Sequence, residues 1–341
     1  MRRLALALVV GVGLTLAACS DAPSSSSSSE TTTEPGWARI DDALAELGPD
    51  VGFLAARVSP DGRCHPVHEL AASTPRPTAS QFKLFVLGAL ADRITAGRVS
   101  WDQTLTVQDA TRSLGNAEGS LQVEPAGTVV SVEETATKMI SISDNTAADM
   151  LIGLVGRDAV EAQVRRWTAH PSANEPFLTT RQMLLLHYVE GLADRYLAVP
   201  RGQRERFLAS TVDPLSLGEI GSGYSDEPRY IDEIEWFASP DDVCRTFAGL
   251  EGLSKEQALA PLSPVLSRQV AGIGLDRSDW PTVWYKGGSE PGVLTLGWLA
   301  TNGDGTTFVV EAMVSNPDAA LAPDSIKDLV ALAQEAFALL A

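Results

Sequence analysis

A serine and a lysine stand three positions apart in residues 78–90, TASQFKLFVLGAL. On a helix this spacing places Ser80 and Lys83 on one face, and the surrounding apolar residues leave no polar face. Such a helix lies inside a protein, where an ammonium group is costly unless it pairs with an anion or works as a neutral amine. The pattern therefore predicts a hydroxyl at the start of a buried helix, with a desolvated lysine one turn away that can act as its base.

Two further short elements carry groups suited to the same chemistry. Ser143-Asp144-Asn145 lies between two predicted helices and offers a hydroxyl and an amide from one turn. Lys286-Gly287-Gly288 is predicted to end the strand TVWYK, and its glycines would let a substrate lie close to the backbone. Together the three elements supply a nucleophile, a base, a proton relay and a cation for an anionic group, which is the equipment of acyl transfer.

The composition argues against several other functions. There are 26 basic and 44 acidic residues, a net charge of −18, and no cluster of lysine and arginine stands out, so nucleic acid is not an expected partner. The four histidines show no repeated metal-ligand spacing and there is no Gly-rich phosphate loop, so we expect neither a metal nor a cofactor. Cys64 and Cys244 could pair in an oxidising compartment, but the sequence cannot show that they meet.

The first 36 residues have the composition of a targeting segment and a linker. Two arginines precede an apolar run from Leu4 to Ala18, which is short for a bilayer span and typical of a secretory signal peptide over residues 1–18. The run ends in LAAC, which resembles a bacterial lipobox with Cys19 as the lipidated residue; a plain signal peptide cleaved nearby is the alternative. Residues 19–36 are predicted to form a flexible tether. We therefore expect export and lipid anchoring at the outer face of the bacterial cell membrane.

The remaining residues, 37–341, predict a mixed α/β (α+β) domain. Strand-like segments lie at 51–59 and 67–72 and again after residue 280, whereas the signals between them are mainly helical. The economical architecture is an antiparallel sheet with flanking terminal helices, formed by residues 37–75 and 280–341. An all-helical lobe over residues 76–279 interrupts it, with a cleft where the two lobes meet.

The three short elements, in this order, resemble the S-x-x-K, S-D-N and K-T-G motifs of the serine β-lactamase and penicillin-binding protein superfamily. Ser80 and Lys83 match the first motif, residues 143–145 match the second in full, and residues 286–288 match the third except at its middle position. The resemblance spans residues 37–341, with the element order of the class A branch. It implies a class A β-lactamase-like fold.

The resemblance also implies catalytic roles. Ser80 would be the acylated nucleophile and Lys83 its activator. Ser143 would pass a proton to the leaving nitrogen, and Lys286 would orient that serine and attract a substrate carboxylate.

Substrate-binding roles follow in the same way. Asn145 would hold a substrate amide carbonyl, Gly288 would let the substrate lie against the strand, and the backbone N–H groups of Ser80 and Ser289 would form the oxyanion hole. Asp144 is expected to brace its own loop, since short carboxylates readily accept N–H groups of a turn. Gly287 replaces the usual hydroxyl-bearing residue, a loss for which Ser289 could compensate.

A second departure concerns the glutamate that, in class A enzymes, activates the deacylating water. The segment 167–179 is short, and its only acid is Glu175. EPFLT can be aligned with the family's E-P-x-L-N. FLTTRQM, however, also matches the start of the family's following helix, and the two alignments cannot hold together unless much of the family's loop is deleted here. The second alignment is favoured, so Glu175 is a weak candidate for the base and the acyl-enzyme is expected to persist. Residues 195–238 exceed what a minimal class A enzyme needs and are expected to shape the cleft entrance.

The leading hypothesis is a monomeric, lipid-tethered, β-lactamase-like serine hydrolase that forms an acyl ester on Ser80 with β-lactams or related small esters and amides. Two alternatives stay open. One is a D,D-carboxypeptidase or esterase on the same fold, and the other is a non-catalytic lipoprotein that senses or sequesters penicillins. Turnover separates the enzymes from the sensor, but the substrate depends on the shape of the pocket.

Overall fold

The computed structural model describes residues 35–115, 118–221, 223 and 225–341. The predicted signal peptide and Cys19 lie outside the described residues, as does the predicted tether apart from its last two positions. Within the described ranges, no helix combines the length and the apolar character needed to cross a membrane.

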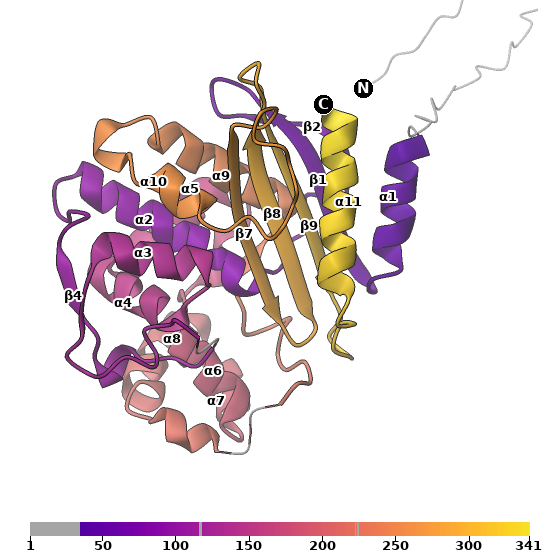
Figure 1. Ribbon diagram of the computed structural model, residues 1–341. Helices are drawn as coiled ribbons and strands as arrows, with labels where there is room; N and C mark the ends of the chain where they lie inside the picture. Colours follow the sequence, from indigo (N-terminus) through magenta and orange to yellow (C-terminus); the bar gives the residue numbers. More distant parts are fainter. Residues whose placement is uncertain (1–34, 116–117, 222, 224) are drawn as a thin grey trace, which may run out of the picture. The chain divides into compact units, whose positions relative to one another are not determined.

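A five-stranded antiparallel sheet in the order β2-β1-β9-β8-β7 organises the fold (Figure 1). Its strands come from the two ends of the chain, and β1 pairs with β9 in continuous register, so the prediction of a shared sheet is confirmed. The β7 strand is left at one edge. The strands are β1 (Asp50–Val58), β2 (Cys64–Leu70), β7 (Thr282–Glu290), β8 (Val293–Thr301) and β9 (Thr307–Ser315).

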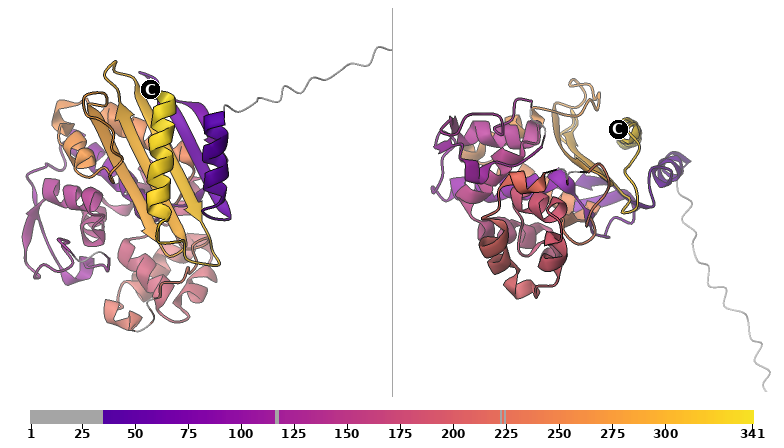
Figure 2. Two further views of the ribbon diagram at one scale, coloured as in Figure 1. Left: turned by 45° about the vertical axis from the view of Figure 1, so that its right-hand side comes forward. Right: turned by 90° about the horizontal axis from the view of Figure 1, so that it is seen from below.

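The two faces of the sheet bury separate hydrophobic cores. Helices α1 (Pro35–Ala45) and α11 (Ser325–Leu340) cover one face, and the helical lobe covers the other, as the view from below shows (Figure 2). Because side chains alternate along a strand, Phe53 of β1 joins the core under α11 whereas Leu54 joins the core of the helical lobe. Both faces of the sheet are therefore apolar.

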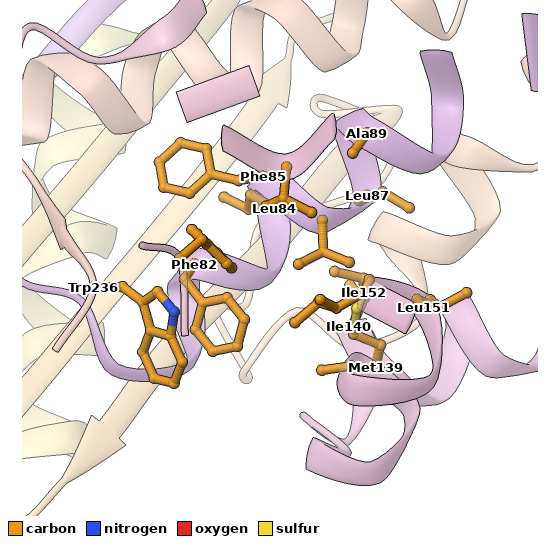
Figure 3. Packing of buried hydrophobic residues seen from close by; sticks show 14 of the residues in the cluster. Phe82, Leu84, Phe85, Leu87, Ala89, Met139, Ile140, Leu151, Ile152 and Trp236 are labelled. Carbon is orange, nitrogen blue, oxygen red and sulfur yellow. The ribbon is translucent and has the colours of Figure 1, made fainter. Parts of the chain in front are cut away.

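Helix α2 (Lys83–Thr95) forms the centre of the helical lobe. Phe82, just before it, and Leu84 and Leu87 within it are buried, and Figure 3 shows them packed with residues of α3 and α4 and with Trp236. The other helices of the lobe are α3 (Val132–Ser141), α4 (Asn145–Val155), α5 (Arg157–Trp167), α6 (Thr180–Tyr188), α7 (Leu192–Leu197), α8 (Arg201–Phe207), α9 (Pro240–Leu253) and α10 (Leu262–Ser267).

Capping interactions fix the first residues of two of these helices. The Ser131 side chain accepts a hydrogen bond from the Glu134 N–H at the start of α3, and Thr179 and Gln182 form a reciprocal capping box at the start of α6. Long-range pairing completes the lobe. Two short two-stranded sheets pair β3 (Arg76–Pro77) with β6 (Phe237–Ala238) and β4 (Thr104–Thr106) with β5 (Val129–Ser131), and a disulfide joins Cys64 of β2 to Cys244 of α9.

Two predicted boundaries are wrong. Ser80 does not begin the α-helix: it lies in a 3₁₀ turn, η1 (Ala79–Phe82), and α2 begins at Lys83. Lys286-Gly287-Gly288 does not end its strand either, because β7 continues to Glu290 and pairs there with Val293 of β8. The glycine pair is typical of a strand end, but Gly288 lies within the strand and is needed there because a Cβ at this position would meet backbone atoms of the Ser80 turn.

Candidate active site

The three sequence motifs meet at one cavity, of about 570 Å³, between the edge strand β7 and the helical lobe. Its lining includes residues from all three motifs: Ser80, Ser143, Asn145, Lys286, Gly288 and Ser289. Lys83 lies fully buried behind them. The cleft expected between the sheet and the helical lobe is therefore present, and it contains the groups that the sequence singled out.

Lys83 is the centre of the site's hydrogen-bond network. Its Nζ lies 2.9 Å from Ser80 Oγ, 2.7 Å from the Ser143 carbonyl oxygen and 2.6 Å from Asn145 Oδ1. The two carbonyl-type oxygens can only accept, so they take two N–H groups. A neutral amine then keeps its lone pair for the Ser80 O–H, which is the geometry of a base poised beside a nucleophile.

Burial of Lys83 favours that neutral form. Desolvation lowers the pKa of its amine to about 7, against the smaller opposing effects of the Asp144, Asp149 and Glu235 carboxylates. The amine can therefore exchange a proton near neutral pH, which matches the requirement for a general base.

Ser143 Oγ bridges two buried lysines. It lies 3.1 Å from Lys83 Nζ and 3.1 Å from Lys286 Nζ, and Lys286 also donates to the carbonyl oxygen of Gly287. Burial, reinforced by the neighbouring Lys83 charge, holds the pKa of Lys286 well below its usual value. A proton can thus pass between either lysine and the Ser143 hydroxyl.

Unusual backbone conformations aim these side chains. Ser143 has a φ of 57° and Ala79, just before the nucleophile, has a φ of 43°, both in the left-handed region that costs energy for residues other than glycine. Asp144 braces the Ser143 turn as expected: its Oδ1 accepts from the Ala147 N–H at 3.0 Å and its Oδ2 from the Leu121 N–H at 2.6 Å.

Strand β7 runs directly against the turn that carries Ser80. A Cβ added to Gly288 would lie 2.1 Å from the Thr78 carbonyl oxygen and 2.7 Å from the Ser80 amide nitrogen, so only glycine fits. The sequence analysis missed two residues that hold the same contact. Gln81 Nε2 donates to the Lys286 carbonyl oxygen at 3.1 Å and to Glu311 Oε2 at 2.9 Å. Both residues are buried and tie η1 to the sheet.

The expected substrate-binding groups face the same cavity. The Asn145 amide donates one N–H to the Leu114 carbonyl oxygen at 2.6 Å and has a second N–H for a ligand. Ser289 is exposed on β7, one position beyond Gly288.

Glu175 lies apart from these residues. It is absent from the cavity lining, its side chain is 43% exposed, and its Oε1 lies 2.9 Å from Arg165 Nη1 on the outside of the lobe. The neighbouring Phe177 points inward and packs against Phe82. Sequence proximity to the second motif thus does not bring Glu175 to the cleft.

The long stretch 195–238 contributes to the cavity instead. Its end runs beside the nucleophile, where the Thr78 N–H donates to the Trp236 carbonyl oxygen at 2.8 Å and the Trp236 ring stacks on Phe82 at 3.7 Å between centroids. Glu235, next to Trp236, is buried and hydrogen-bonds to Glu290 at the end of β7. Sequence reasoning overlooked both glutamates, although continuing the two-residue alternation of β7 from Lys286 would have placed Glu290 on the same face.

Comparison with known proteins identifies the family and the fold. The sequence profile of the β-lactamase enzyme family matches residues 38–337. No curated protein is similar enough to count as a match.

Several solved structures share the fold. One is a PBP-A mutant in an acyl-enzyme complex with penicillin G (17% identity, TM-score 0.59, covering 89% of this chain and 96% of that one). Another is a β-lactamase from Sphaerobacter thermophilus (21% identity, TM-score 0.59, with 89% and 96% covered). A third is the class A β-lactamase described as the last common ancestor of Gram-negative bacteria (15% identity, TM-score 0.60, with 90% and 100% covered). The mixed α/β fold is class A β-lactamase-like, and this chain belongs to the β-lactamase enzyme family.

Proposed function

We propose that this protein is a serine hydrolase that forms an acyl ester on Ser80 with β-lactams or related small esters and amides. The observation that supports the proposal most directly is the 2.9 Å contact between Ser80 Oγ and the buried amine of Lys83. Lys83 takes the Ser80 proton as Oγ attacks the substrate carbonyl carbon, and the backbone N–H groups of Ser80 and Ser289 hold the oxyanion. Ser143 then protonates the leaving nitrogen.

Release of the acyl group is proposed to be the slow step with β-lactams. Glu175 is paired with Arg165 outside the cavity, so the glutamate nearest in sequence to the usual position of the water-activating base does not reach the ester. The same observation favours a second candidate function, a penicillin-binding lipoprotein that is acylated once and does not turn over.

Mixing the enzyme with penicillin G tests the proposal. Intact-mass analysis is expected to show one acyl adduct, located on the Ser80 peptide, and stopped-flow traces should show a stoichiometric burst followed by slow turnover. Ser80→Ala should lose the adduct and reduce hydrolysis by roughly three orders of magnitude or more. Full hydrolysis by Ser80→Ala would falsify the proposed mechanism, and an adduct with no second phase would select the sensor over the hydrolase.

We also propose that the protein is exported and anchored through a lipid on Cys19. The proposal comes from the sequence, and the disulfide between Cys64 and Cys244 is consistent with an oxidising compartment.

A further inference from the structure

Two buried carboxyl groups meet beside the nucleophile. Glu235 immediately precedes Trp236 and Glu290 is the last residue of β7, and their carboxyl groups hydrogen-bond to each other. Oε1 of each carboxyl is buried and accepts from no N–H or O–H donor among the described residues, whereas Glu235 Oε2 accepts from the Trp236 N–H. Two carboxylates cannot hydrogen-bond without a proton, so the pair shares one.

The backbone places this pair at the turn that carries Ser80. Lys286, Gly288 and Glu290 alternate along β7 and so lie on one face of the strand, the face that packs against the Ser80 turn. Glu235 reaches the same turn from the other side, where it accepts from the Ala79 N–H. Glu290 lines the same cavity as Ser80 and is the only acid among the described residues that line it.

From this placement we infer that Glu290 is the base that activates water to hydrolyse the acyl-Ser80 ester, with Glu235 as the positioning residue that shares its proton. The inference rests on the proposed function, and it explains how an enzyme whose Glu175 points away can release its product. No other carboxylate among the described residues of the cavity is available for this step.

The step balances without any further reactant. The Glu290 carboxylate takes a proton from water while the water oxygen bonds to the ester carbonyl carbon, and the carbonyl π electrons move onto oxygen. Collapse of that oxyanion breaks the bond to Ser80 Oγ, which takes the proton back. The products are a free carboxylic acid and the Ser80 hydroxyl.

The electrostatics of the pair suit this work. Burial raises the pKa of Glu290 to about 7, partly offset by the hydrogen bond from Glu235, and burial together with Glu290 raises the pKa of Glu235 well above its usual value. Glu235 therefore keeps the proton, and Glu290 is the member that ionises near neutral pH. The cations nearby are Lys83, at the start of α2, and Lys286 on the same face of β7.

The decisive experiment separates acylation from deacylation with penicillin G. Glu290→Gln is expected to keep a full burst and the Ser80 adduct, and to slow the second phase by about 100-fold or more, as expected for loss of a general base. Glu175→Gln is the matched control, because it makes the same change outside the cavity and should leave both phases unchanged. Aspartate at position 290 should restore part of the second phase.

The pH profile of the second phase tests the role of Glu235. A base works when unprotonated, so the wild-type rate should rise with pH through a midpoint near 7, and Glu290→Gln should show no such rise. Glu235→Leu removes the donor that favours the Glu290 carboxylate, so its midpoint should move to higher pH, whereas Glu235→Gln keeps a donor and should stay near wild type.

Each remaining result overturns a specific statement. If Glu290→Gln and wild type have equal second-phase rates, the inference is overturned. It is also overturned if Glu290→Gln slows the burst and the second phase equally, because that result indicates a structural role for the pair. Loss of affinity for ammonium-bearing substrates alone would make the pair a binding site for a substrate cation and would also overturn it. Absence of any adduct on wild-type Ser80 overturns the proposed function and this inference with it.

Discussion

At the scale of single residues, two lysines contact the same hydroxyl, that of Ser143. Both Lys83 and Lys286 are buried, and each has its Nζ 3.1 Å from Ser143 Oγ. Lys83 also contacts Ser80 Oγ and Asn145 Oδ1, whereas Lys286 also donates to a carbonyl oxygen of its own strand. In the proposed mechanism Ser143 is the relay, Lys83 takes the proton of Ser80, and Lys286 attracts the anionic group of the substrate.

Replacing each lysine by alanine tests that division. Lys83→Ala should stall acylation by every substrate, because Lys83 supplies the amine that lies 2.9 Å from Ser80 Oγ. Lys286→Ala should lower kcat/KM most for carboxylated substrates, by about 10- to 100-fold. This loss corresponds to removal of a charge-assisted contact worth ~1.5–3 kcal/mol. The measurement is a set of acylation rates for matched neutral and anionic esters, and equal losses on both kinds after Lys286→Ala would contradict the division.

At the scale of elements, the site depends on how closely β7 approaches η1. The Thr78 carbonyl oxygen and the Ser80 amide nitrogen occupy the space that a side chain at position 288 would need. The Gln81 amide bridges the same two elements by bonding to the Lys286 carbonyl oxygen and to Glu311. The Glu311 carboxyl is fully buried, and desolvation raises its pKa well above the usual value. A neutral acid there avoids leaving an unpaired charge between sheet and helix.

Gly288→Ala should separate these two elements. Backbone atoms cannot rotate aside, so the strand must shift, at a cost of about 1–3 kcal/mol in the free energy of unfolding and a fall of roughly 100-fold in the acylation rate. Gly287→Ala is the control: its Cβ would meet the Tyr285 hydroxyl and a Leu296 methyl group, which are side-chain ends that can move. Denaturant unfolding and stopped-flow acylation measure the two effects, and similar behaviour of the two variants would refute this account of the packing.

At the scale of the whole molecule, the sheet joins the two ends of the chain. The pairing of β1 with β9 runs from Asp50 with Ser315 to Val58 with Thr307, and the disulfide joins β2 to α9 across 180 positions. An oxidised pair of this kind fits a protein exported from the cytoplasm. Residues 19–36 would then connect the domain to a lipid on Cys19.

Lipid anchoring makes a prediction about fractionation. Wild-type protein expressed in a bacterial host should incorporate labelled palmitate and sediment with membranes, and Cys19→Ser should lose the label and leave the membrane fraction. Ser80→Ala, a change confined to the cavity, should fractionate like wild type. Retention of the label by Cys19→Ser would instead support a plain signal peptide and rule out the lipidation site.

The sequence by itself determined the elements and the chemistry of three motifs, because those signals are local. The strands at both ends of the chain and the spacing of Ser80 and Lys83 depend on neighbouring residues, and the structure has both as expected. The helix caps at Ser131 and Thr179 are local in the same way. The wrong boundary at β7 arises from packing, because a glycine that is needed for close approach cannot be told from a glycine in a turn by sequence alone.

Only the tertiary structure decided which acids reach the cleft. Glu175 follows the second motif in sequence but pairs with Arg165 outside the lobe, whereas Glu235 and Glu290 come from distant elements and meet beside Ser80. Their proximity depends on β6 pairing with β3 and on β7 packing against η1, contacts between segments far apart in the chain. Burial then gives these carboxyls their raised pKa values, and burial is a property of the whole fold that no local pattern of residues specifies.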